Sequence, residues 1–576
     1  MSRRRLLLVV ASALGATLVV PAVASAHAVL LQTVPSASGV VNTPPTKVAL
    51  TYSEAVEPRF AIVSVTNAAG TQETAGTPSR SPSNSDELDV PLRHLAEGWS
   101  LVYWRVISVD GHPVRGAFTF AVGPNPGPAP QFVIPSTNET AATPSLLTAR
   151  WIVFLSTMAA VGLLVFRAII ARPIRQRVPG SSLRALTIAL AAALGVALVA
   201  TPIYVLIATA EFSLRSVWDV GALIPLMRVS AFGRGYLDLE LVLALLAVAT
   251  ALLVRVERPE SRQRPVSELL ALLGALLAAG AAVSVPGISG HAGQTSPRSV
   301  SLGLDWLHVA AGSIWVGGLI GLLVVWSGLC AELRLPGLAI SVPRFSRVAF
   351  VSVMVLIASG VGSSLVHIPT VASLWQTSYG QALLVKVALL GGAMLLAPIN
   401  MLRNTPRLAN AQTRPEEARN AASLLRGLVT AEVVLVAGAI FAAAVLTSLI
   451  PPPKALAEIG SASKHVGPGA VVETVEHGPY RLTFRIDPNR AAVPNSFSVA
   501  IAKNGKLVHG ADVTTTFTML DMEMGQLAYA LSETEPGVYT RSAPALVMVG
   551  HWGLSFDIRP PHTAPFTVVL VDKAAG

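Results

Sequence analysis

The chain has 576 residues, of which 52% are hydrophobic and only 13% are charged. This composition is too apolar for a set of soluble domains, and several nearly uncharged segments of about twenty residues have the length that crosses a bilayer. The net charge of +10 does not indicate nucleic-acid binding, because many arginines stand in short loops between apolar segments. A single cysteine, Cys330, excludes an intrachain disulfide and a thiolate metal cluster.

Residues 1–26 have the pattern of a signal peptide. Three arginines at 3–5 precede the apolar run 6–20, and Ala-Ser-Ala at 24–26 fits an A-x-A cleavage site. An uncleaved membrane anchor is the alternative. Cleavage would make His27 the first residue of the mature chain, with a free α-amine. Because that amine has a pKa of about 8, it can give up its proton to a metal, and amine and imidazole together suit Cu(II).

Residues 27–122 predict an all-β domain of the Greek-key sandwich type. Segments rich in β-branched and aromatic residues alternate there with Pro, Gly and Ser. Asp110 and His112 are two residues apart, so an extended backbone projects both from one face. With the amine and imidazole of His27 they make a set of three nitrogens and one oxygen. On these residues alone, a turn that carries them by chance is the favoured interpretation. The predicted strand segments are 48–52, 60–66, 101–109 and 117–122.

This region contains the passages HAVLLQTVPSASG…VALTYSEAVEP and VYWRVISVDGHPVRGAFTFAV. They resemble the CopC family of periplasmic copper-binding domains, over essentially all of 27–122. The resemblance implies that His27, Asp110 and His112 bind Cu(II), with Glu54 in a supporting position. Some family members carry a methionine-rich Cu(I) site, but residues 27–122 contain no methionine, so a Cu(II)-only domain is implied. His94 matches no family motif and is expected in a surface loop.

Residues 123–145 are rich in Pro, Gly, Ser and Thr and predict a linker. Eight apolar segments follow and predict an α-helical transmembrane domain over 146–450. The loops after the first, third, fifth and seventh segments contain several arginines, so the positive-inside rule places them in the cytoplasm and both chain ends outside. The predicted spans are 146–169, 183–209, 237–255, 266–287, 303–327, 348–367, 382–402 and 424–447.

Three histidines are predicted at the outer face of this domain. His291 precedes the fifth span, His308 lies about two turns into it, and His367 ends the sixth. Ionisable groups at membrane depth are costly and indicate function, although three unrelated interfacial histidines are the alternative. Glu432 lies deep in the last span and Lys386 near the outer end of the seventh. Their depths differ too much for an ion pair, so Glu432 has no predicted partner.

Four motifs of the membrane region are GHAG, DWLHVAAGSIWVGGL, RFSRVAF and YGQALLVKVALL. They resemble the CopD family of membrane domains, over about 146–450 and most strongly from 291 to 390. The resemblance implies an association with copper uptake and puts all three histidines at motif positions. Gly317 and Gly318 are expected to let a neighbouring helix approach closely.

Residues 451–576 predict a second exported β-domain, with strand-like alternation over 466–573. The passages FTMLDMEMGQL, PGVYT and MVGHWGLSFDI resemble the YtkA-like family, which implies an immunoglobulin-like fold. Met522 and Met524 share one strand face with Leu520. Their thioethers suit Cu(I), and packing of a small core is the alternative.

Together these features predict a copper-binding, multi-pass protein of the cytoplasmic membrane with both terminal domains extracytoplasmic. We expect it to be no enzyme, to capture Cu(II) outside and to pass copper to the outer-face histidines for import. The expected partners are copper ion, the lipid bilayer and other extracytoplasmic copper carriers. Two alternatives stay open. One is a haem- or copper-dependent membrane redox protein with His308 and His367 as axial haem ligands. The other is a copper sensor or scaffold for copper resistance that moves no metal.

Overall fold

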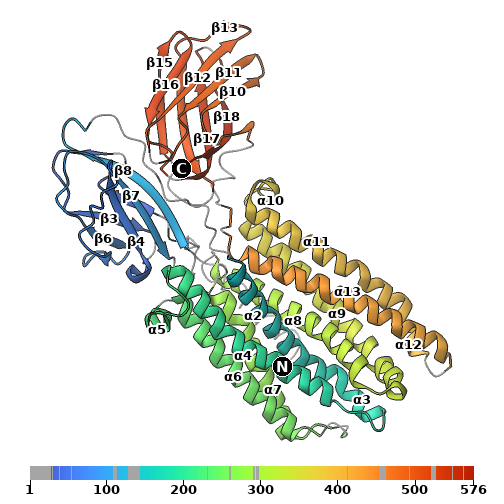
Figure 1. Ribbon diagram of the computed structural model, residues 1–576. Helices are drawn as coiled ribbons and strands as arrows, with labels where there is room; N and C mark the ends of the chain where they lie inside the picture. Colours follow the sequence, from blue (N-terminus) through green and yellow to red (C-terminus); the bar gives the residue numbers. More distant parts are fainter. Residues whose placement is uncertain are drawn as a thin grey trace, which may run out of the picture. The chain divides into compact units, whose positions relative to one another are not determined.

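The computed structural model describes residues 28–575 except for short segments, and Figure 1 shows a β-domain, a helical domain and a second β-domain in chain order. Each of these three parts is described by itself. The residues outside the description within that range are 29, 38, 54, 108–112, 127–142, 230, 259–260, 262, 290–291, 293–296, 411–412, 450, 453–461, 492, 521–526, 548 and 562.

The N-terminal domain is a sandwich of two four-stranded sheets, as predicted. Burial alternates in the strands Ile62–Asn67 and Glu87–Pro91, whereas Gly98–Ile107 is buried along most of its length. The core between the sheets holds Tyr52, Trp104, Phe118 and Phe120. Phe60 does not begin a strand as expected, because Pro58 starts a one-turn 3-10 helix there. One sheet has the order β1 (Leu30–Val34), β3 (Lys47–Tyr52), β6 (Glu87–Pro91), β5 (Ser79–Arg80), and the other β2 (Val40–Val41), β8 (Pro113–Val122), β7 (Gly98–Ile107), β4 (Ile62–Asn67).

The middle of the chain is a bundle of helices. In the described part of the chain, eight helical segments are long and apolar enough to cross a membrane, and each overlaps one predicted span. Several are longer than predicted, because helical turns continue into the flanking loops. The elements are α2 (Pro144–Val165), η2 (Phe166–Ala171), α3 (Arg172–Arg177), α4 (Arg184–Ser213), α5 (Val220–Val229), α6 (Ala231–Val256), α7 (Val266–Ser289), α8 (Arg298–Gly328), α9 (Ala331–His367), α10 (Ser373–Gln376), α11 (Ser378–Ile399), η4 (Asn400–Asn404), α12 (Thr405–Ala409) and α13 (Pro415–Leu446).

Consecutive long helices pair as antiparallel hairpins, visible in Figure 1 as α6 with α7, α8 with α9 and α11 with α13. Helix α2 packs against α4 and α8. Near the N-terminus of α2, the guanidinium of Arg150 donates to the Tyr204 hydroxyl on α4 and to the Ala444 carbonyl on α13. Two segments, η2 and η4, are π-helical, a wider turn that is rare in helices and frequent at functional sites.

The C-terminal domain is all-β, as predicted. Strand β15 pairs with both β14 and β16, and the Phe484 and Phe556 rings, on strands far apart in the pairing order, lie 4.6 Å apart. The pairing path therefore folds back on itself around a core. The order is β10 (Val471–His477), β11 (Tyr480–Asp487), β12 (Asn495–Lys503), β16 (Val538–Ala543), β15 (Leu527–Glu535), β14 (Asp512–Met519), β17 (Gly550–Arg559), β18 (Phe566–Ala574), β9 (Lys464–Val466), with β13 (Lys506–Leu507) beside β12.

One polar pair is buried beside this core. Asp572 on β18 is fully buried and accepts a hydrogen bond from the Asn489 side-chain amide at 2.8 Å. The same amide donates to the Gly469 carbonyl at 2.9 Å. The pair therefore ties the segment that follows β9 to the last strand of the domain.

Candidate functional site

Most of the predicted metal ligands lie outside the described residues, so their assignment stays a prediction. Of the predicted set, the structure places His308 and His367. The ligands and supporting residue outside the described part are His27, Glu54, Asp110, His112, His291, Met522 and Met524.

The described flanks of the predicted Cu(II) ligands lie toward the same end of the N-terminal sandwich. Strands β7 and β8 pair up to Ile107 and Pro113, so the segment with Asp110 and His112 joins their ends. In the other sheet, Leu30 at the start of β1 pairs with Tyr52. The Tyr52 ring meets the Trp104 ring edge-on, with centroids 5.6 Å apart. Trp104 is three residues from the end of β7, about 10 Å along the strand.

Tyr52 adds a group that the sequence analysis missed. Its hydroxyl is buried and has no hydrogen-bond partner among the described residues. Burial raises the pKa of Tyr52 well above its ordinary value, so the hydroxyl keeps its proton and can donate. Leaving a buried hydroxyl without a hydrogen bond costs about 1–3 kcal/mol of folding free energy. We therefore expect the Tyr52 hydroxyl to donate to an acceptor that is not among the described residues. The only feature of the sequence that could have indicated this tyrosine is its place in the motif VALTYSEAVEP.

His308 faces two other helices of the membrane domain. Its Nδ1 lies 3.2 Å from the Ser359 hydroxyl on α9, and its Nε2 lies 3.4 Å from the Lys386 Nζ on α11. The Ser359 hydroxyl donates to the Val355 carbonyl, so it is free to accept from Nδ1. An ammonium has no acceptor, so Lys386 donates to Nε2. The lone pair that a copper ion would use is therefore directed at Lys386.

Asp305 lies one turn before His308 on α8, and sequence analysis had not singled it out. A Cβ added at Gly287 on α7 would come within 2.2 Å of its Oδ2, so the carboxylate lies directly against that glycine. Asp305 also interacts electrostatically with Lys386. Residues of α7, α8, α9 and α11 thus converge on one polar cluster (Asp305, His308, Ser359 and Lys386) inside the bundle. The cluster needs helix packing to be recognised, because its members are distant in sequence.

His367 lies apart from this cluster. Its Nδ1 is 2.8 Å from the Ser363 carbonyl of the preceding turn. It follows Ser359 by eight residues, about 12 Å along the axis of α9. The structure therefore does not bring His308 and His367 into contact. Within the described residues, no three His, Cys, Asp or Glu side chains form a group able to hold a metal ion.

The expected close approach at the paired glycines is confirmed. A Cβ at Gly317 would lie 2.3 Å from the Gly162 carbonyl carbon of α2, and one at Gly318 would lie 1.9 Å from the Phe345 ring of α9. Trp315 is buried in the same helix. These residues fix how α8 packs on α2 and α9, and thereby where His308 sits.

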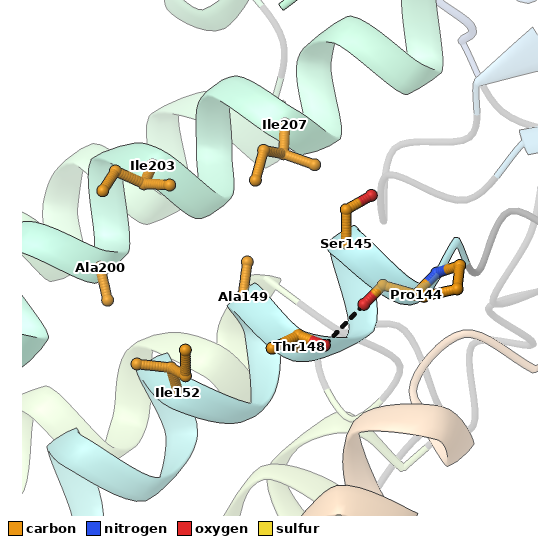
Figure 2. A pocket seen from close by; sticks show the side chains of 8 residues that line it. All are labelled: Pro144, Ser145, Thr148, Ala149, Ile152, Ala200, Ile203 and Ile207. Atoms are coloured by element: carbon orange, nitrogen blue, oxygen red, sulfur yellow. Dashed lines mark hydrogen bonds between the residues drawn. The ribbon is translucent and has the colours of Figure 1, made fainter.

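A cavity of about 480 Å³ lies between α2 and α4, and Figure 2 shows its lining side chains converging from the two helices. Its lining is mainly aliphatic, and the Thr148 hydroxyl is turned away to donate to the Pro144 carbonyl. With no His, Met or carboxylate, the lining does not suit a metal ion. The lining residues are Pro144, Ser145, Thr148, Ala149, Ile152, Ala200, Ile203 and Ile207.

In the C-terminal domain, the structure describes the strand that precedes the predicted methionine site. Met519 is buried and pairs across β14 and β17 with Trp552, so it packs in the core. Leu520 contacts Val569 and Val571 in a separate small cluster. Exposed His94 lies in a loop of the N-terminal domain, as expected.

The fold is that of a multi-pass membrane protein, in which one β-domain precedes the helices along the chain and another follows them. The CopC domain family matches residues 30–123, copper resistance protein D matches 339–446, and the YtkA-like family matches 474–557. The chain therefore carries a CopC domain, a CopD domain and a YtkA-like domain in that order. His367 lies inside the CopD match, and His308 precedes it.

Three proteins illustrate the similarity. Copper transport protein CutJ of Bacillus subtilis (strain 168) is 26% identical over 540 residues, 92% of this chain and 93% of CutJ. Protein YobA of Escherichia coli (strain K12) is 36% identical over 110 residues, 19% of this chain and 88% of YobA. The crystal structure of CopC from Methylosinus trichosporium OB3b is 28% identical, with a TM-score of 0.16, and covers 19% of this chain and 100% of that chain.

Proposed function

We propose that this protein binds copper outside the cytoplasmic membrane and imports it. The main support for this proposal is the order of CopC, CopD and YtkA-like domains, together with similarity to a copper transport protein along 92% of the chain. In this proposal copper is the cargo, and the chain supplies the ligands that capture it and hand it on.

Capture takes place on the N-terminal sandwich. His27 supplies an amine and an imidazole, and Asp110 and His112 supply an oxygen and a third nitrogen, a set that suits tetragonal Cu(II). The described flanks support this assignment, because β1 and the β7–β8 hairpin approach the same end of the sandwich. The Tyr52 hydroxyl is then a donor available to orient a ligand.

Transfer leads to the histidines of the membrane domain, His291, His308 and His367. His308 lies ten residues into α8, about 15 Å along its axis, and its Nε2 faces Lys386. Copper can occupy that nitrogen only when the Lys386 ammonium moves away. His308 is therefore a site that copper reaches after the cluster rearranges, and His291 and His367 are the earlier contacts.

The C-terminal domain is a second copper-binding site in this proposal. Met522 and Met524 bind Cu(I) there, since thioethers are soft ligands. Both terminal domains lie outside the membrane, as the arginine-rich loops between the spans favour.

Cell copper content tests the proposal. Cells lacking the gene are complemented with the wild type or with His291→Ala, His308→Ala or His367→Ala, and copper is measured at low external concentration. Each variant should lower accumulation with protein level and membrane insertion unchanged. His94→Ala is the matched control, because that histidine is exposed in a loop. Wild-type accumulation in all three variants would refute import through these histidines.

The redox alternative has its own readout. A haem held by His308 and His367 would give the purified protein a strong visible absorption band. If His291→Ala is silent while the other two substitutions abolish such a band, the redox function replaces transport.

A further inference from the structure

Glu432 lies near the middle of α13 and is 2% exposed. Its Oε1 accepts a hydrogen bond of 2.8 Å from the Asn400 side-chain amide. The Asn400 Oδ1 in turn accepts one of 2.8 Å from the Asn404 side-chain amide. We name these three residues the Glu432 cluster. It joins α13 to the π-helix η4 and belongs to none of the sites proposed above.

The cluster contains a carboxyl group that pairs with no basic side chain in the part of the chain that the structure describes. The buried carboxylates Glu257 and Glu268 are paired with arginines at 2.6 Å and 3.2 Å. Glu432 forms no such pair among the described residues, and its hydrogen-bond partner there is a neutral amide. Isolated buried charges are strongly unfavourable, so a carboxyl group at this depth either holds a proton or is balanced by a cation.

The cluster also has a buried acceptor without a donor. Asn404 is fully buried, and its Oδ1 has no hydrogen-bond partner among the described residues. Within the cluster the Asn400 amide donates to Glu432 and the Asn404 amide donates to Asn400, and neither donates to the Asn404 oxygen. A single proton would satisfy one pair of these acceptors, whereas a metal cation can contact several oxygens at once.

The backbone at this point is irregular. Asn400–Asn404 is π-helical, and π-turns inside helices are frequent at functional sites. The Asn400 carbonyl accepts from the Thr405 hydroxyl at 3.0 Å, so it is already displaced from a regular helical bond. In membrane proteins, irregular backbone carbonyls and helix ends are the groups that coordinate Na⁺.

We propose that the Glu432 cluster is a binding site for a hard monovalent metal cation, with Na⁺ as its simplest occupant. Oxygen donors suit a hard ion and not the soft Cu(I). One positive charge neutralises the one carboxylate, whereas a divalent ion would leave a buried excess charge. The cation ties α13 to η4 by replacing the missing donor for Asn404.

Thermal unfolding of the purified full-length protein tests this site. The midpoint is measured in detergent without copper, in NaCl and in choline chloride at equal ionic strength. Na⁺ should raise the wild-type midpoint in a saturable way, because a ligand that binds the folded state stabilises it. Glu432→Gln keeps the shape and the acceptor for Asn400 and should abolish the response. Glu240→Gln, in another span, should keep it.

A second variant covers the case in which Glu432→Gln does not fold. Asn404→Ala removes the unpartnered carbonyl and should raise the Na⁺ concentration for half the effect at least tenfold, measured also by equilibrium binding of radioactive Na⁺. Equal wild-type midpoints in the two salts, or a Na⁺ response that survives in Glu432→Gln, overturn the proposal. The proposal is also overturned if the wild type binds no Na⁺ and loses stability as pH rises, with Glu432→Gln abolishing that loss. The carboxyl then holds a proton instead of a cation. Copper transport is untouched by either result.

Discussion

Raising the pH from about 4 to about 7 should weaken the C-terminal β-domain through the buried carboxyl of Asp572. Burial raises the pKa of Asp572 from 3.8 to about 6, while hydrogen bonds from the Asn489 amide and the Lys573 backbone partly oppose that rise. His551 also favours the charged form. Ionisation is therefore more costly in the folded domain than in the unfolded chain.

The sign and size follow from linkage. Well below the ordinary pKa of 3.8 the carboxyl is protonated in both states, and well above the folded-state pKa of about 6 it is charged in both. Between these limits the folded domain binds the proton more tightly, so the free energy of unfolding falls as pH rises. A pKa difference of about two units corresponds to about 3 kcal/mol, or about a hundredfold in the unfolding equilibrium.

Hydrogen exchange measures this loss in the full-length protein. The rates are expressed as protection factors of the β17 and β18 amides, which removes the direct effect of pH on exchange chemistry. These protection factors should fall about a hundredfold between about pH 4 and about pH 7. Asp572→Asn keeps an acceptor for Asn489 but cannot ionise, so its protection should change much less. Identical pH profiles for the wild type and the variant, or a wild-type profile that rises with pH, would refute the reasoning.

Four further expectations can be checked separately. One glycine added before His27 in the mature protein should greatly weaken Cu(II) binding in a titration, because the α-amine moves away from the imidazole; unchanged affinity would defeat the chelate. Replacing Met522 and Met524 by leucine should abolish Cu(I) binding by the C-terminal domain with little change in stability, since Leu and Met exchange at small packing cost; surviving binding would return them to the core. Gly317→Val should collapse the yield of folded protein in gel filtration, because even a Cβ would meet the Gly162 backbone at 2.3 Å, whereas Gly427→Ala, with nothing within 4 Å, should be tolerated. Tags at both termini should be cleaved by protease added to spheroplasts, and a protected C-terminus would contradict the proposed orientation.

Hydropathy was sufficient to predict the architecture. The eight spans follow from nearly uncharged segments of bilayer length, and the two β-domains follow from alternation with turn residues. Helix ends were less accessible to this reasoning, because helical turns continue beyond the apolar core. The helix from Arg298 begins five residues before its predicted span, for example.

The polar clusters could not be predicted in the same way, because they depend on which helix faces meet. Depth alone correctly separated Lys386 from Glu432, but it could not indicate that Lys386 meets His308 or that Glu432 meets Asn400. Asn400 lies in a π-helical turn, which rotates its side chain away from the position that a regular α-helix would give. The Gly317 contact was predictable because paired glycines have a direct steric meaning.

The contact between Gly162 and Gly317 has a mechanical consequence for the membrane domain. A Cβ at Gly162 would lie 1.9 Å from the Ser313 carbonyl oxygen, so the backbones of α2 and α8 touch without intervening side chains. Neither helix can come closer to the other without a clash, because no side chain separates the two backbones at this crossing. The two helices therefore form one rigid unit within the bundle. We therefore expect any rearrangement that opens a route for an ion to change the packing of other helices and to leave this pair intact.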